Sequence, residues 1–207
     1  PDDFEMPADG LSIRIVDDRI PQEARMQYYK RWAAHAYARR NGIDKRMRGA
    51  AGAKVGIVSA GKNWLDVAHA LDLLGIDEAA ARRMGLTVYK PAMIYPLEPT
   101  GFREWANGLD MIVVVEEKRS LLESQIKEIL YGTPGAPRIV GKRDEDGEVL
   151  FPVEMGLSPV DVALKLGGIL FAEGLAGEVN TRRIEALETA ANSANIATTP
   201  DRTPWFC

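Results

Sequence analysis

Short apolar runs alternate with amphipathic stretches through the middle of the chain. Runs rich in Val, Ile and Leu predict strands at 55–59, 86–90, 111–115 and 137–141. The stretches between them repeat apolar residues every three or four positions and predict helices at 63–74, 77–84 and 100–107, and between Ser120 and Gly132. Strands that do not alternate are buried on both faces, and strands separated by helices favour parallel pairing. The pattern therefore predicts an α/β fold, with an open, doubly wound sheet that carries helices on both sides.

Two of these helices allow more detailed predictions. In the first, one face is predicted to be buried because its apolar residues follow a helical spacing: Leu65, Ala68, Leu71 and Leu74. In the last, Ser120 and Glu123 have the spacing of a capping box, in which a hydroxyl and a carboxylate satisfy the first backbone N–H groups. We therefore expect these two side chains to start that helix.

The N-terminal residues follow a different pattern. Pro21 and Gly42 are typical of the first turn and the end of a helix, and they bracket a helical stripe at 21–41. The alternation in 11–16 predicts either an edge strand or an extended connector. The charged pair Lys45-Arg46 is interpreted as solvated surface, and residues 48–53 as a loop.

The C-terminal residues again predict helices. Ser158 and Pro159 favour the start of a helix that runs to about 171, and a second helix is predicted at 180–195. We therefore divide the chain into three parts: an N-terminal extension at 1–50, an α/β domain at 51–145, and a helical extension with a linker at 146–207.

Composition limits the class of protein. Of the 207 residues, 46% are apolar and 27% are charged, which is enough for a packed core. The net charge of −4 and the lack of a long Lys/Arg stripe argue against a nucleic-acid partner. The longest apolar runs are too short to span a bilayer, so no membrane partner is expected. A single cysteine, Cys207, excludes a disulfide within the chain and favours the reducing cytoplasm. A first residue other than Met and a last residue that is Cys207 suggest a fragment.

Candidate chemistry lies at the carboxyl ends of the predicted strands, where open α/β sheets bind ligands. The residues there are Gly61, Lys62, Asn63, Glu117, Lys118, Arg119 and Arg143. The cations among them would bind a phosphate or carboxylate near helix N-termini, or else would pair with neighbouring carboxylates or another domain. For the adjacent carboxylates Glu116 and Glu117, capping and salt bridging are favoured over acid/base catalysis, because neighbouring strand residues point in opposite directions.

Standard motifs for other chemistry are missing. The stretch Ser59-Ala60-Gly61-Lys62 lacks the glycine spacing and the hydroxyl residue of a phosphate-binding loop. His35 and His69 fall in predicted helices with no second ligand at metal-binding spacing, so we expect no metal site in this chain. No catalytic residue is predicted.

Several segments together resemble the indolepyruvate ferredoxin oxidoreductase family. The segment Val113-Val114-Val115-Glu116-Glu117-Lys118-Arg119 carries most of the likeness. The others, in order along the chain, are 10–14, 55–67, 73–76, 95–99 and 137–144. The ending Arg202-Thr203-Pro204-Trp205-Phe206-Cys207 is similar to the start of that family's next domain, where Cys207 would be the first cysteine of a C-x-x-C-P motif and a possible cluster ligand in the full-length protein.

The resemblance implies an internal domain of a long fused chain. Its fold would be like the C-terminal domain of transketolases: three layers around a five-stranded, mostly parallel sheet with one antiparallel edge strand. The parent enzyme would use thiamine diphosphate, Mg, [4Fe-4S] clusters and coenzyme A, and would pass electrons from an aryl 2-oxoacid such as indolepyruvate to ferredoxin. This sequence lacks the G-D-G motif for thiamine diphosphate and has one cysteine, so the isolated chain is expected to bind none of these cofactors and to be inactive.

The domain's role in such an enzyme would be structural, with the other domains as partners and a homodimer as the assembly. An apolar patch that includes Trp64, Trp105 and Leu121-Leu122 would make the isolated chain self-associate. The alternative is an independent α/β module that binds a small anion or regulates another protein.

Overall fold

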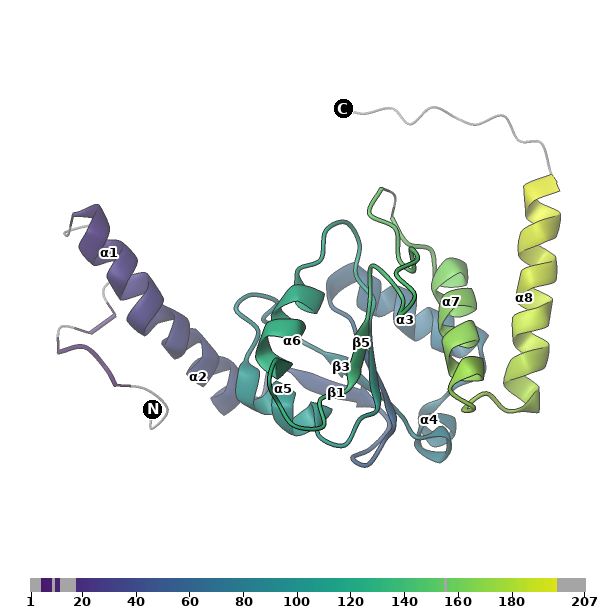
Figure 1. Ribbon diagram of the computed structural model, residues 1–207, viewed down its shortest axis with the longest axis horizontal. Helices are drawn as coiled ribbons and strands as arrows, with labels where there is room; N and C mark the ends of the chain where they lie inside the picture. Colours follow the sequence, from purple (N-terminus) through teal and green to yellow (C-terminus); the bar gives the residue numbers. More distant parts are fainter. Residues whose placement is uncertain (1–4, 9, 12–17, 155, 197–207) are drawn as a thin grey trace.

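The structure is a computed structural model that describes residues 5–8, 10–11, 18–154 and 156–196 (Figure 1). Residues 12–16 of the segment predicted as an edge strand or connector lie outside the described residues, and so does Cys207.

A five-stranded sheet forms the centre of the molecule. Its strands are β1 (Lys45–Arg48), β2 (Val55–Val58), β3 (Leu86–Lys90), β4 (Met111–Val114) and β5 (Arg138–Val140), in the order β1-β3-β2-β4-β5. Strands β2 to β5 are parallel, and β1 pairs antiparallel with β3. The four predicted strands, and the mostly parallel five-stranded sheet that the resemblance implied, are confirmed.

Strand β1 is the element that the sequence pattern did not predict. Lys45 pairs with Lys90 and Arg46 with Tyr89, so the charged pair interpreted as solvated surface belongs to the sheet. Its side chains are mostly exposed, because an antiparallel edge strand contributes its backbone hydrogen bonds rather than a buried face. An apolar pattern is therefore absent, and the loop interpretation was wrong at Arg48.

Helices cover both faces of the sheet, as predicted (Figure 1). On one face, α3 (Gly61–Leu73), α4 (Glu78–Met84) and α7 (Pro159–Ala172) share a core with alternate strand residues such as Ile57 and Val113. On the other face, α5 (Pro99–Ala106) and α6 (Leu122–Leu130) pack with Ile112 and Val114. The three-layer arrangement is thus confirmed, and β2, β3 and β4 are buried on both sides.

Residues beyond 145 contribute to this core. Phe151, Val162, Leu166 and Leu170 are buried with the strands, although the sequence pattern placed them in an extension. The Ser158 side chain accepts a hydrogen bond from the Asp161 N–H and starts α7, as predicted. Helix α8 (Glu178–Ile196) packs against α7 on its outer side (Figure 1).

The predicted N-terminal helix forms, but with an irregular centre. It consists of α1 (Arg19–Arg25), a π-helical stretch at Met26–Lys30 labelled η1, and α2 (Arg31–Asn41). Gly42 ends it in the left-handed conformation, with φ of 52°. The run projects from the body, which only the end of α2 approaches (Figure 1).

Some predicted side-chain positions were wrong. On the predicted face of α3, Leu71 is buried as expected, but Leu65 is 65% exposed, because the helix buries Val67 and Ala70 beside Leu71. In the predicted apolar patch, Trp105 and Leu122 are buried in the core, whereas Leu121 is exposed. The order of strands and the glycines that end helices indicate which residues form a helix. The rotation of the helix about its own axis is set by the elements against which it packs.

Candidate functional site

The carboxyl ends of the parallel strands meet at one edge of the sheet. The connection from β2 leads to its neighbour β3 on one side, and the connection from β4 leads to its neighbour β5 on the other side. The two connections therefore diverge between the adjacent strands β2 and β4. This divergence is where open α/β sheets place ligands. The buried Ser59 hydroxyl joins the two strand ends through a 2.9 Å hydrogen bond to the Val115 carbonyl.

Lys62 lies in the first turn of α3 and is already paired. Its ammonium is 2.8 Å from Glu117 Oε1 and 2.9 Å from Asp66 Oδ2, and it also donates to the Leu157 carbonyl. The hydrogen bonds that Lys62 donates, to Glu117 first and then to Asp66, raise the pKa of Lys62, and the bond to Glu117 is the largest cause that lowers the pKa of Glu117. The neighbouring Asn63 accepts from the Glu117 N–H at 3.1 Å. These contacts leave Lys62 little capacity for an added anion.

The segment 150–158 reaches across the same edge. The Leu157 N–H donates to Glu117 Oε1 at 2.9 Å, and Lys118 Nζ donates to the Glu154 carbonyl at 2.8 Å. Lys142 donates to the Glu116 and Pro152 carbonyls, and burial lowers its pKa. The segment thus connects the ends of β2, β4 and β5.

Glu116 caps a helix. The side chain is 8% exposed, and it accepts backbone N–H bonds from Leu121 and Leu122 at Oε2 and from Glu123 at Oε1, at 2.9 to 3.1 Å. The contacts of Glu116 and Glu117 are therefore the capping and salt bridging that were favoured for this pair. The predicted capping box was wrong: Ser120 bonds to the Ser124 hydroxyl, and Glu123 accepts from Lys127 and from the Lys142 N–H.

The remaining candidates lie toward solvent. Arg119 is exposed, and Lys118 has a left-handed backbone with φ of 56°. Arg143 donates to the Gly147 carbonyl at 2.6 Å within the turn that follows β5, so its guanidinium is engaged there. Gly61 is exposed and begins α3 with φ of 56°. The structure therefore joins Lys62, Asn63, Glu117 and Lys118 through shared contacts with one another or with segment 150–158, whereas Arg143 bonds elsewhere.

Among the described residues there is no group of three or more His, Cys, Asp or Glu side chains that could hold a metal ion. The residues in the described ranges also include no helix long and apolar enough to cross a membrane.

Residues 45–194 match the family model of the indolepyruvate oxidoreductase domain. The chain belongs to this family. The match confirms the resemblance, and it includes both the edge strand β1 and the helix α7. A comparison with curated proteins finds no match.

Two solved structures are similar to parts of this family member. A split-gene transketolase, described as an inactive beta4 tetramer, is 24% identical with a TM-score of 0.41, over 63% of this chain and 42% of that one. The 2-oxoglutarate:ferredoxin oxidoreductase from Magnetococcus marinus, with 2-oxoglutarate, coenzyme A and succinyl-CoA bound, is 12% identical with a TM-score of 0.48, over 81% of this chain and 26% of that one. The chain spans less than half the length of either protein.

One feature of this oxidoreductase domain was missed by sequence reasoning. His35 of α2 lies beside Glu98 and Thr100, which belong to the start of α5, and lines a cavity of about 230 Å³ with Trp32 and Arg39. The sequence indicated only a histidine within a helix, because the cavity depends on how α2 packs against α5, some 60 residues later.

Proposed function

We propose that this chain is a structural domain of a thiamine-diphosphate-dependent 2-oxoacid:ferredoxin oxidoreductase of the indolepyruvate type. The parent enzyme would oxidatively decarboxylate an aryl 2-oxoacid to its acyl-CoA and pass the electrons to ferredoxin. In this proposal the chain itself supplies no catalytic residue. Membership of the indolepyruvate oxidoreductase domain family supports the parent activity.

The observation that carries the structural role is the internal use of the strand-end side chains. Lys62 is held by Asp66 and Glu117, Glu117 also accepts from the Leu157 N–H, and Glu116 caps α6. These side chains bond to one another, to the start of α6 and to the segment 150–158. This edge is therefore suited to fixing the shape of the domain.

The proposed parent enzyme also implies the cofactors and partners of this chain. We propose that thiamine diphosphate, Mg, [4Fe-4S] clusters and coenzyme A bind to its other domains, which are the partners of this chain in a cytoplasmic homodimer. We propose that the α/β unit extends beyond the predicted division at 51–145 on both sides, because its sheet begins at β1 and its core includes α7.

An anion or interdomain contact at the strand ends would involve Lys118 and Arg119. Both side chains are exposed, and Lys118 is held by only one carbonyl contact. Titration of the isolated chain with inorganic phosphate, followed by the amide signals of these residues, tests this contact. Saturable shifts there would favour the alternative of an independent anion-binding module, whereas their absence would leave the interdomain role.

Activity assays test the main proposal. The isolated chain should reduce no methyl viologen with indolepyruvate and coenzyme A, and robust turnover would refute the proposal. In the whole enzyme, Lys62→Met should lower the unfolding midpoint but change kcat/KM by less than about twofold, because only structural contacts are lost. The matched control is Lys165→Met, at an exposed lysine of α7. Lost turnover in Lys62→Met, with the unfolding midpoint of the control, would assign Lys62 to the reaction.

A further inference from the structure

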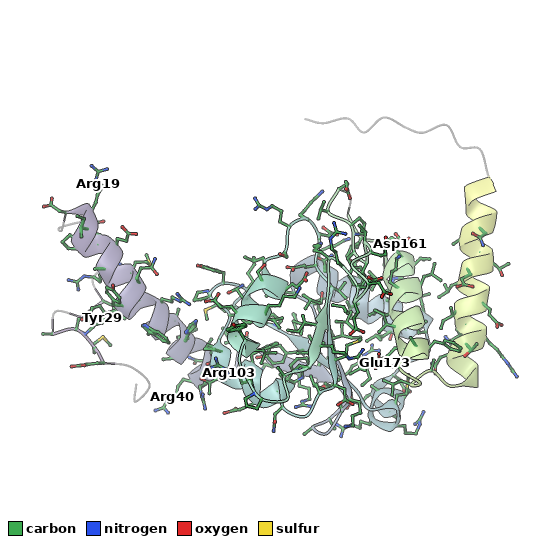
Figure 2. All side chains as sticks on the ribbon, viewed as in Figure 1. Arg19, Tyr29, Arg40, Arg103, Asp161 and Glu173 are labelled. Carbon is green, nitrogen blue, oxygen red and sulfur yellow. The ribbon has the colours of Figure 1, made fainter. Side chains whose placement is uncertain are left out.

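The N-terminal helical run is held to the body by a small contact. None of the residues of α1 or η1 is buried, and in α2 the buried residues are His35, Ala36 and Ala38. Arg19 and Tyr29 lie out along the helix, whereas Arg103 lies where the helix meets the body (Figure 2). Because this contact buries so little surface, the charge of one buried polar side chain affects whether the helical run stays docked.

His35 is that side chain. It is 7% exposed, and both ring nitrogens are buried with no hydrogen-bond partner among the described residues. Its ring and the Trp32 ring form a T-shaped contact, with centroids 5.6 Å apart and planes at 85°. A neutral imidazole loses hydrogen bonds in this position, and an imidazolium would in addition bring a charge and a second donor without an acceptor.

The charges around this position do not provide that acceptor. Arg31 and Arg39 approach from α2 itself, and from the body the cavities beside His35 are lined by Glu98, Arg103 and Glu128. Both oxygens of the buried Glu98 carboxylate already accept N–H bonds, from Thr100 at 2.8 Å and Gly101 at 2.6 Å. An exposed ion pair between Arg39 and Glu104 at 3.1 Å also joins the helix to α5, and exposed pairs of this kind contribute little.

We propose that His35 is a pH-dependent latch: its neutral ring lets α2 dock on α5, and protonation releases the helical run. Release would be a rotation of the helical run about Gly42. Two residues later the chain is fixed to the body, because Asp44 accepts N–H bonds from Ala92 and Met93 at 2.7 and 3.3 Å. The latch goes beyond the structural role proposed above and does not depend on it.

The direction of the pH effect follows from the proton balance. Burial, followed by the charge of Arg31, lowers the pKa of His35 below the ordinary imidazole value of 6.5, and Glu98 opposes this only in part. The released helix has an ordinary imidazole and binds the proton more readily. Docking is therefore fully present above pH 6.5 and is lost as the pH falls through the lowered pKa. One proton changes the ratio of docked to released helix by at most about tenfold per pH unit.

NMR of the 207-residue chain tests the latch, and the chain is favourable because it contains two histidines. Imidazole signals and amide exchange of Trp32–Ala38 would be followed from about pH 8 to about pH 4.5. The expected result is that His35 titrates below 6.5 and that protection of these amides falls with the same midpoint. In His35→Phe, or in His35→Gln if the first variant does not fold, protection should no longer fall with that midpoint.

Two control variants separate the latch from other titrations. His69→Gln, at an exposed position of α3, should leave the transition unchanged. Arg39→Ala, which removes the ion pair with Glu104, should lower protection but should not abolish its fall with pH, because His35 is still present. A His35 midpoint at or above 6.5 would overturn the proposal, and so would a transition that persists in both His35 variants, since a group other than His35 would then be responsible.

Discussion

Glu116 shows how one side chain links a strand to the next helix. It leaves the end of β4 and accepts the first three N–H groups around the start of α6, which otherwise have no partner. A charged acceptor at this position also interacts favourably with the helix dipole. The strand exit and the helix start are thus fixed by the same carboxylate.

We predict that Glu116→Gln destabilises the domain by about 1–3 kcal/mol, because the charge and one of the two acceptor oxygens are lost at a buried site. Urea unfolding followed by circular dichroism measures this. Ser120→Ala is the comparison, and it should cost less than about 0.5 kcal/mol because Ser120 does not cap the helix. A larger cost for Ser120→Ala than for Glu116→Gln would restore the capping box and contradict the structure.

Residue-level prediction from the sequence succeeded where local chemistry decides and failed where packing decides. Ser158 caps α7 and Gly42 ends α2, because a hydroxyl before a helix and a glycine after it act through nearby backbone. Ser120 has equally good spacing, but Glu116 occupies the donors from outside the helix. The pairing of Lys62 with Leu157 likewise joins residues 95 positions apart, which no local pattern indicates.

At the scale of elements, two adjacent glycines of α7 have opposite surroundings. A methyl group added at Gly167 would lie 2.8 Å from Ile184 Cγ1 and Cδ1 of α8, whereas nothing lies within 4 Å of one added at Gly168. Gly167 therefore sets how closely α8 approaches α7. Gly168 is an exposed glycine inside the helix, so its effect on stability is the backbone entropy that a glycine loses on folding.

We predict that Gly168→Ala stabilises the chain by about 0.5–1 kcal/mol, through the helix propensity of alanine. Gly167→Ala has the same propensity gain but must displace Ile184, so it should speed amide exchange throughout α8 and give less stability than Gly168→Ala. Urea unfolding and amide exchange of the two variants measure these effects. Equal exchange in α8 for both variants would show that α8 does not rely on this close approach.

Element prediction was strongest for strands buried on both faces and weakest at the edge. Runs such as Met111–Val114 are apolar because helices cover both sides, and this is visible without a structure. Strand β1, Lys-Arg-Met-Arg, joins the sheet through its backbone and keeps polar side chains in solvent. Its existence followed only from the family resemblance, which implied an antiparallel edge strand without locating it.

For the whole molecule, the question is which residues make a self-sufficient core. On the face covered by α3 and α4, the buried cluster also contains residues that follow the predicted domain: Leu150, Phe151, Leu157, Val162, Ala163, Leu166 and Leu170. A chain of residues 51–145 would lack these side chains and β1. It would expose the apolar surface of α3 and leave β3 as an unpaired edge, both of which favour association.

We therefore predict that a chain of residues 45–177 unfolds cooperatively in urea, whereas 51–145 shows no cooperative transition and associates on size-exclusion chromatography. The longer chain keeps the five strands and α7. With α8 it loses the partly buried contacts of Ile184 and Leu187 and the hydrogen bonds that Asn180 and Arg183 donate to carbonyls at the end of α3. Restoring β1 alone, in residues 45–145, separates the two causes: it protects the edge of β3 but leaves the α3 face bare, so association should persist. Cooperative unfolding of 51–145 with the free energy of 45–177 would mean that α7 covers the core without contributing to it, and the boundary at 145 would then stand.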